Sequence, residues 1–128
     1  MKKFNVKFAA TLLLGVIVVP AIAFIVWHFQ VNRNASNLLG RANAFRDEGN
    51  FREAIRLQER YLAYRPQDTE QLCKVALDYL QLIEKDKEID RLDIGRAYGR
   101  CEEALRQVPE NHELRKQTVD FMIEVRRY

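Results

Sequence analysis

Apolar and polar residues divide the chain into one long uncharged run and a series of shorter amphipathic stripes. The uncharged run extends from Phe8 to Phe29. At about 1.5 Å of rise per residue it spans about 33 Å as a helix, which matches the hydrocarbon core of a bilayer. Trp27 and His28 stand near its far end, where an amphipathic ring lies at the level of the lipid headgroups. We therefore expect a transmembrane helix over residues 8–29.

The alternative interpretation of this run is a cleaved signal peptide. Lys2 and Lys3 would form its basic start, and Ala21-Ile22-Ala23 would resemble its cleavage site. However, strong apolarity continues past that site to Trp27, where the chain after a signal peptide normally becomes polar. This continuation favours an anchor that is retained.

The charge distribution indicates how the anchor is oriented. Lys2, Lys3 and Lys7 account for the net charge of +3, so the part after the apolar run is neutral overall. By the positive-inside rule, residues 1–7 lie in the cytoplasm and the rest lies beyond the membrane. We expect a bacterial inner membrane, with the helical domain on its periplasmic side. A neutral domain has no long-range field to attract phosphates, so we expect no nucleic-acid binding.

After the anchor, the pattern predicts helices only. A polar linker at residues 30–35 leads to a helix N-cap at Asn34 or Ser36. From there apolar residues recur at helical spacing and never alternate with period two, so we expect an all-α domain over residues 36–128. Its helices are separated by Gly49-Asn50, Arg65-Pro66, the charged run Lys85–Asp93, and Pro109-Glu110-Asn111.

The stripes repeat along the chain. Three apolar positions recur 34 residues later: Leu38, Ala42 and Phe45 become Leu72, Ala76 and Tyr79. Three others recur 43 residues later: Ala54, Leu62 and Pro66 become Ala97, Leu105 and Pro109. The two offsets differ by the length of the run 85–93, which therefore looks like an insertion between the helices of the second pair. A third partial copy begins after Pro109. Such periods are typical of stacked helix pairs.

This chain resembles the tetratricopeptide repeat (TPR) family, in a membrane-anchored bacterial form. The residues that carry the resemblance are Ala42, Phe45, Gly49, Phe51, Ala54 and Pro66. The resemblance covers about residues 36–128 and implies a short α-solenoid of about two and a half helix pairs. It implies that the pairs are packed by Ala42, Phe45, Gly49, Ala54, Pro66, Ala76, Tyr79, Ala97, Ala104 and Pro109.

The resemblance further implies a concave groove, lined by the first helix of each pair, that takes a helix or an extended peptide of another protein. The residues on these faces are Leu39, Asn43, Arg46, Asp47, Glu70, Cys73, Leu77, Leu80, Lys116, Asp120 and Ile123. The alternative for Leu39, Leu77 and Leu80 is packing against neighbouring helices. Chaperone-binding members of the family hold a carboxylate in a basic clamp, but Leu39 stands where the clamp needs a lysine, so we expect no clamp.

Nothing in the sequence indicates catalysis. Cys73 and Cys101 are interpreted as small buried residues, with a disulfide between them as the alternative. His28 and His112 have no nucleophile and carboxylate arranged around them, and paired carboxylates such as Glu102-Glu103 fall on solvated helix faces. We therefore expect no enzyme, no metal site and no cofactor.

These features together predict a single-pass membrane protein that acts as an adaptor or assembly factor for other proteins. One alternative is a structural accessory subunit of a larger membrane complex. Another is that the chain is the N-terminal part of a longer TPR protein, because the last predicted helix is the first half of a repeat.

Overall fold

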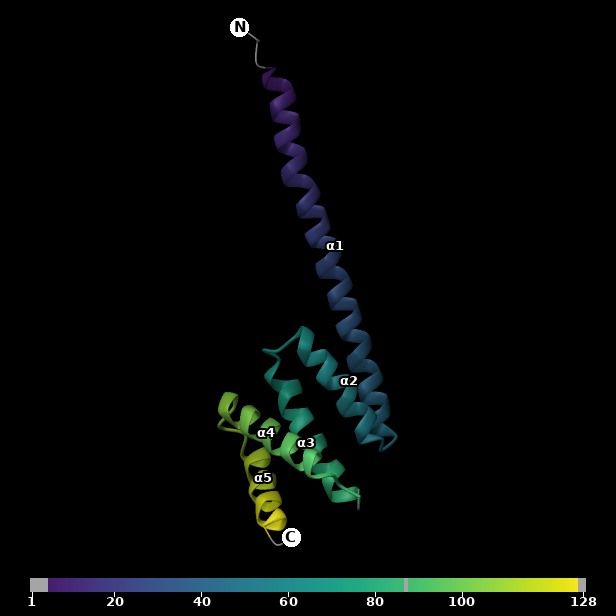
Figure 1. Ribbon diagram of the computed structural model, residues 1–128, viewed down its shortest axis with the longest axis vertical. Helices are drawn as coiled ribbons and strands as arrows, with labels where there is room; N and C mark the ends of the chain where they lie inside the picture. The colour runs from purple at the N-terminus through teal and green to yellow at the C-terminus, as the bar shows by residue number, and fades with distance from the viewer. Residues whose placement is uncertain (1–4, 87, 127–128) are drawn as a thin grey trace. The chain divides into compact units, whose positions relative to one another are not determined.

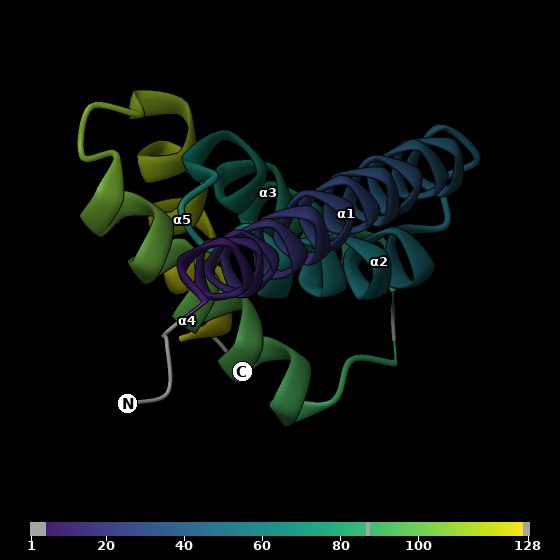
Figure 2. The ribbon, with the colours of Figure 1, turned by 90° about the horizontal axis from the view of Figure 1, so that it is seen from above.

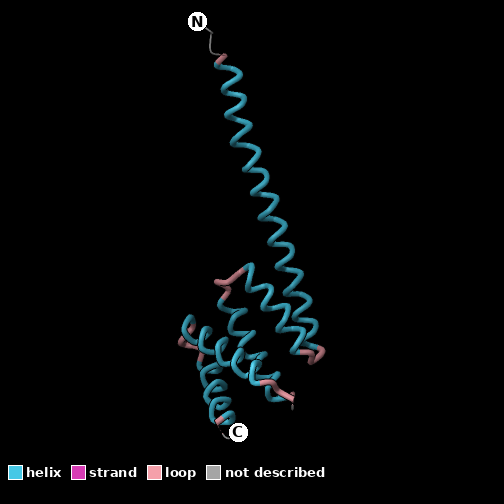
Figure 3. Tube along the Cα trace, in the orientation of Figure 1, coloured by secondary structure: helices cyan, strands magenta, loops and turns pink. Residues whose placement is uncertain are grey.

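The computed structural model describes residues 5–86 and 88–126, so Lys2, Lys3 and Tyr128 lie outside the described residues. All regular structure in these ranges is α-helical (Figures 1 and 3). The helices are α1 (Val6–Asp47), α2 (Phe51–Tyr64), α3 (Thr69–Lys85), α4 (Arg91–Gln107) and α5 (His112–Val125). The all-α prediction is therefore confirmed, and the arrangement of a TPR solenoid stays a prediction.

The first part of α1 carries the apolar run. The large apolar side chains of this run are exposed, from 43% for Val18 to 71% for Phe29. The hydroxyl of Thr11, a polar group within the run, donates to the carbonyl oxygen of Lys7 at 2.8 Å, so it is satisfied inside the helix. Among the residues that the structure describes, one helix is thus long and apolar enough to cross a membrane.

The predicted break between the anchor and the next helix is not a break in secondary structure. Residues 30–36 continue α1, and Asn34 and Ser36 are helical residues rather than N-caps. The physical reason is that this polar stretch contains neither glycine nor proline, so nothing interrupts the hydrogen bonds between each N–H and the carbonyl four residues earlier. By its contacts, however, the chain divides into residues 1–34 and residues 35–128.

Within the second unit, capping side chains define where helices begin. Asn50, Asp68 and Asn111 each precede a helix and accept a hydrogen bond from the backbone N–H three residues later, at 3.3, 3.1 and 3.0 Å. Gly49 forms the turn between α1 and α2 with φ of 78°, a conformation that L-residues with a Cβ rarely adopt.

α3 is the central helix of the unit, because it packs against α2, α4 and α5, while α4 also packs against α5. Small residues on these helices permit close packing: Ala54, Ala76, Ala97 and Ala104 are all 0% exposed, as is Ala42 in α1. The loop that leads into α4 lies at the edge of the unit in Figure 2. Of the charged run 85–93, Lys85 is the last residue of α3 and residues 91–93 are the first turn of α4, while Asp86 and residues 88–90 lie outside the helices.

Candidate functional site

The predicted groove residues differ in their exposure. Arg46, Leu39 and Leu77 are half-buried, and Cys73 and Leu80 are buried in the core. The remaining residues of the set are exposed: Asn43, Asp47, Glu70, Lys116, Asp120 and Ile123. Leu39, Leu77 and Leu80 therefore pack against neighbouring side chains with most of their surface, and the exposed polar members and Ile123 are available to another molecule.

The predicted repeat-packing residues also fall into two groups. The five alanines and Tyr79 are buried, and Phe45 is half-buried. Gly49, Pro66 and Pro109 are exposed, and each lies at a turn between helices. Their contribution is to the geometry of the turns rather than to the core.

Three helices of the second unit converge on a buried carboxylate. Asp78 of α3 has a side chain with 0% exposure, and its Oδ2 accepts a hydrogen bond of 2.9 Å from Nε2 of Gln58 on α2. The guanidinium of Arg46, near the end of α1, lies 3.0 Å from Asp78 Oδ1 through its Nε. Of the three, only Arg46 belongs to the predicted groove, where it now has a partner inside the protein.

The polar atoms in this cluster are incompletely paired. The Arg46 Nε–H does not point along a hydrogen bond to Asp78 Oδ1, so the contact is an ion pair without hydrogen-bond geometry. Gln58 Oε1 also has no hydrogen-bond partner among the described residues. Burial raises the pKa of the Asp78 carboxyl, while the Gln58 hydrogen bond and the nearby charges of Arg46 and Lys74 oppose this rise.

A second feature is an open groove of about 910 Å³ between α2 and α4, which we call the α2–α4 groove. Its apolar floor is formed by Ile55, Tyr79 and Leu82. Its walls are charged residues of the two helices: Arg52, Glu53, Arg56, Glu59 and Arg60 of α2, and Asp93, Arg96, Arg100 and Glu103 of α4.

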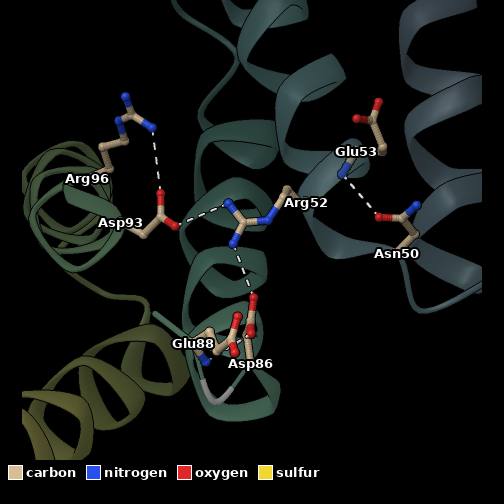
Figure 4. Close-up of polar contacts among 7 residues, drawn as sticks. All are labelled: Asn50, Arg52, Glu53, Asp86, Glu88, Asp93 and Arg96. Carbon is tan, nitrogen blue, oxygen red and sulfur yellow. Dashed lines mark hydrogen bonds and ion pairs between the residues drawn. The ribbon is translucent and has the colours of Figure 1, made fainter. Parts of the chain in front are cut away.

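At one end of the α2–α4 groove, the Arg52 guanidinium lies between two carboxylates (Figure 4). It is 3.1 Å from Oδ2 of Asp86, just after α3, and 3.2 Å from Oδ2 of Asp93, in the first turn of α4. Asp93 also pairs with Arg96 at 3.6 Å, and Asp86 accepts the backbone N–H of Glu88 at 3.2 Å. The Glu88 N–H and Arg52 lower the pKa of Asp86. Arg52 thus ties the two ends of the loop between α3 and α4 to α2.

At the other end, Arg100 of α4 makes a two-pronged contact with Glu59 of α2. Its Nε donates to Glu59 Oε1 at 2.8 Å and its second terminal nitrogen donates to Oε2, while the first donates to Glu103 at 2.6 Å. The hydrogen bond to Glu59 raises the pKa of the guanidinium, which therefore stays charged. Burial, with a smaller effect from the Glu59 charge, raises the pKa of Tyr79 on the floor to about 12.

This arrangement is suited to holding helices together more than to reacting with a substrate. Most charges of the α2–α4 groove are paired with each other, so a charged ligand would have to displace existing ion pairs. Within residues 5–86 and 88–126, no three His, Cys, Asp or Glu side chains are grouped as they would be to hold a metal ion.

The two cysteines are free and buried, as the packing interpretation expects. Sγ of Cys101 lies 4.0 Å from the carbonyl oxygen of Ala76, so it contacts the backbone of α3. Burial raises the pKa of the Cys101 thiol, with a smaller opposing effect from Thr118. A thiol held protonated is a poor nucleophile and metal ligand.

The sequence interpretation missed Asp78, Gln58 and the contact between Arg100 and Glu59. A signal existed for Asp78, because it stands among the apolar residues of a helix that is buried on most of its circumference. The identity of its partners had no such signal, because Gln58 is 20 residues away along the chain.

The chain was compared with models of protein families, with curated proteins and with solved structures, and none of them matches. The function is therefore argued from this chain's own residues.

Proposed function

We propose that this protein is a single-pass, membrane-anchored TPR-like repeat protein that binds other proteins as an adaptor or assembly factor. The observation that carries the proposal is a turn between helices, at residues 65–68, that recurs 43 residues later, at residues 108–111, with the same backbone geometry. The same chain also has an apolar helix. Repeat arrays of this kind are built by packing and act through the surface that they present.

The repeated turn begins at a helix C-cap. Arg65, after α2, has φ of −132° and ψ of 66°, and Val108, after α4, has φ of −129° and ψ of 72°. Each donates its N–H to the carbonyl four residues earlier, of Tyr61 and Ala104 respectively. A proline follows each of them, which stops the helix in both copies.

The same turn ends at an N-cap that also repeats. Asp68 before α3 has φ of −78° and ψ of 87°, and Asn111 before α5 has φ of −73° and ψ of 87°. The N–H of each cap bonds to the carbonyl three residues earlier at 3.2 Å. Two turns with different side chains but the same caps and dihedrals support a common repeat unit.

The packing residues support the same unit. Ala42 and Ala76, which are equivalent in the first helices of the pairs, are both 0% exposed, as are Ala54 and Ala97 in the second helices. The longer second period is accounted for by the loop around Glu88, which Arg52 connects to α2.

The proposed location is the bacterial inner membrane, with the N-terminus in the cytoplasm and the helical unit in the periplasm. The positive flank of the exposed apolar helix supports this orientation. Protease added to spheroplasts should then degrade residues 35–128 and leave the N-terminal segment. Protection of the helical unit would reverse the orientation.

The binding function is tested by site-specific photo-cross-linking in living cells. A photoreactive residue replaces the exposed side chains Asn43, Glu70 or Asp120, which belong to the proposed groove. The matched controls are Glu102 and Arg106, exposed residues of α4 outside that set. An adaptor gives a discrete cross-linked product from the first set and none from the controls. Absence of a product from all positions of the first set contradicts the proposal.

An accessory subunit of a larger membrane complex is the second candidate, favoured by the exposed apolar residues Val119, Met122 and Ile123 on α5. The same experiment separates the two functions. A subunit gives products from Ile17 in the anchor as well, and it migrates with the complex on native gels.

A further inference from the structure

α5 has a face that is apolar in its centre and basic at both ends. Val119, Met122 and Ile123 are 49%, 48% and 53% exposed. At about 100° per residue, three basic residues fall on the same arc of the helix. Arg115 and Lys116 lie about one turn toward the N-terminus, and Arg126 lies about one turn toward the C-terminus. All six side chains are exposed, and no acidic residue between Arg115 and Arg126 falls on this arc. We call these six residues the α5 outer face.

The equivalent positions on α3 are covered. Val119, Met122 and Ile123 follow Ala76, Tyr79 and Leu80 by 43 residues, the offset of the repeated turn. The three α3 residues are 0%, 7% and 8% exposed. The helix that meets this stripe is α4, since Cys101 Sγ lies 4.0 Å from the Ala76 carbonyl and Tyr79 faces the groove bounded by α4.

The opposite face of α5 already has its partners. Leu114, Thr118 and Phe121 are buried, and they are equivalent to Gln71, Val75 and Asp78 of α3. α5 contacts both helices of the preceding pair, α3 and α4. α5 therefore has a buried side toward the preceding pair, and its stripe equivalent to the covered stripe of α3 is exposed among the described residues.

We infer that the α5 outer face binds an amphipathic helix of a partner protein, in the way that α4 covers α3. This inference rests on the proposed protein-binding function and names the surface and the chemistry of the partner. Ala97, Cys101 and Ala104 share one face of α4 at helical spacing and are all 0% exposed, and Cys101 on this face contacts the backbone of α3. The partner helix accordingly has a stripe of alanine-sized residues at helical spacing, which permits close packing.

Charge complementarity adds a second requirement. The basic residues at both ends of the α5 outer face favour carboxylates beside the partner's apolar stripe. They also disfavour a second copy of this chain in the same place, because two α5 outer faces would bring Arg and Lys side chains together. A basic and apolar helix face also suits an anionic lipid surface. Because the apolar residues of the α5 outer face are equivalent to the α3 stripe that a helix covers, we favour a partner helix. Binding to a lipid surface is one of the outcomes that the test distinguishes.

The test uses the full chain in nanodiscs of phosphatidylcholine and a labelled synthetic peptide as the probe. The peptide has the sequence of α4, Arg91 to Gln107, with Cys101→Ala to prevent oxidation and with Arg91→Glu and Arg106→Glu to make it acidic. A control peptide of the same charge has Ala97→Gln and Ala104→Gln, which fill the small stripe. Binding is measured by fluorescence anisotropy.

The expected result is saturable binding of the first peptide and at least tenfold weaker binding of the control peptide. Met122→Ser with Ile123→Ser in the protein should weaken binding at least tenfold. Tyr64→Ser with Leu92→Ser, which removes exposed apolar residues elsewhere, should leave it within twofold. In the protein, Lys116→Glu should weaken binding of the peptide, whereas Arg91→Glu in the protein's own α4 should not. Circular dichroism establishes that each variant keeps its helix content.

Three outcomes would overturn the inference. The first is peptide binding that does not change with Met122→Ser and Ile123→Ser, and the second is no peptide binding at all. The third is protection of α5 from hydrogen exchange by phosphatidylglycerol in the nanodisc, without peptide, to the degree that the peptide produces. This would assign the α5 outer face to the membrane.

Failure of the inference is distinct from failure of the proposed function. If photo-cross-linking gives a partner at Asn43, Glu70 or Asp120, and this product persists after Met122→Ser and Ile123→Ser, the adaptor function stands and the α5 outer face is not where the partner's helix binds.

Discussion

At the scale of single residues, Asp78 stands out because it is charged and has no exposed side-chain surface. It connects α3 to Gln58 on α2 and to Arg46 at the end of α1. A buried carboxylate is costly unless it is paired, and removing one partner of a buried pair leaves the others unsatisfied. Asp78 is therefore a residue at which a small change has consequences for three helices.

We predict that Asp78→Ala lowers the free energy of unfolding by about 2–4 kcal/mol, because the buried Gln58 amide loses its acceptor and Arg46 loses its counter-charge. Asp78→Asn is the matched control. It keeps an oxygen for Gln58 and should cost about 1 kcal/mol or less. Urea denaturation of the full chain in detergent, followed by circular dichroism, measures both. Equal losses would show that the hydrogen bond to Gln58 is not what stabilises the cluster.

The raised pKa of Asp78 predicts a pH dependence with a definite sign. The folded carboxyl binds a proton at higher pH than the unfolded one, whose pKa is about 3.9. Its contribution to stability is thus fully present below about pH 3.9 and is lost as the pH rises through the folded pKa. Wild type should therefore gain stability relative to Asp78→Asn as the pH falls from 7 toward 4. Urea denaturation of both proteins at several pH values measures this difference, and an opposite slope would mean that Arg46 dominates over burial.

At the scale of helices, the ends are set by a few local residues. Asn50, Asp68 and Asn111 cap the starts of α2, α3 and α5 with the same hydrogen bond, and Pro66 and Pro109 follow the ends of α2 and α4. Gly49 differs from the other glycines, because its φ of 78° is the positive one among the described residues. A Cβ built on Gly49 meets no atom within 4 Å, so the cost of a side chain there is purely conformational.

We predict that Gly49→Ala destabilises the protein by about 1 kcal/mol, and that Gly49→Asn costs less because asparagine tolerates positive φ. Gly95→Ala should do the opposite. Gly95 lies inside α4 and a Cβ there also meets open space, so alanine should stabilise by about 0.5–1 kcal/mol. Thermal denaturation of the variants measures both effects. If Gly95→Ala also destabilises the protein, the open space around its Cβ is not enough to make alanine favourable inside α4.

At the scale of the whole molecule, the chain combines an exposed apolar helix with a helical unit that has its own core. The first is long and apolar enough to cross a membrane, and the second is stabilised by burial of the stripes on α2 to α5. The division by contacts between residues 34 and 35 falls inside the continuous helix α1.

We predict that Leu13→Arg with Ile17→Arg moves the protein out of the membrane fraction. Each arginine costs about 2.5–3.5 kcal/mol near the centre of a spanning helix. The control, Leu13→Ile with Ile17→Leu, should stay in the membrane pellet after extraction with alkaline carbonate. If the arginine variant also stays in the pellet, the apolar helix is not what holds the protein to the membrane.

The sequence by itself determined the number of helices in the second unit, most of their ends and the apolar segment. These depend on local rules: helical spacing, caps such as Asp68, the prolines, and an uncharged run long enough to cross a bilayer. It misplaced the start of the first helix of the unit, because a polar linker without glycine or proline can continue a helix as easily as end it.

Only the tertiary structure decided which polar residues meet. Gln58 with Asp78, Arg100 with Glu59, and Arg52 with Asp86 join different helices, and side-chain pairs of this kind have no pattern within one helix. The structure also separated two stripes that look alike in the sequence. Ala76, Tyr79 and Leu80 are covered by a neighbouring helix, whereas Val119, Met122 and Ile123 are exposed. An apolar stripe in the sequence indicates that a helix has an apolar side. Which element covers that side depends on the arrangement of the helices in space.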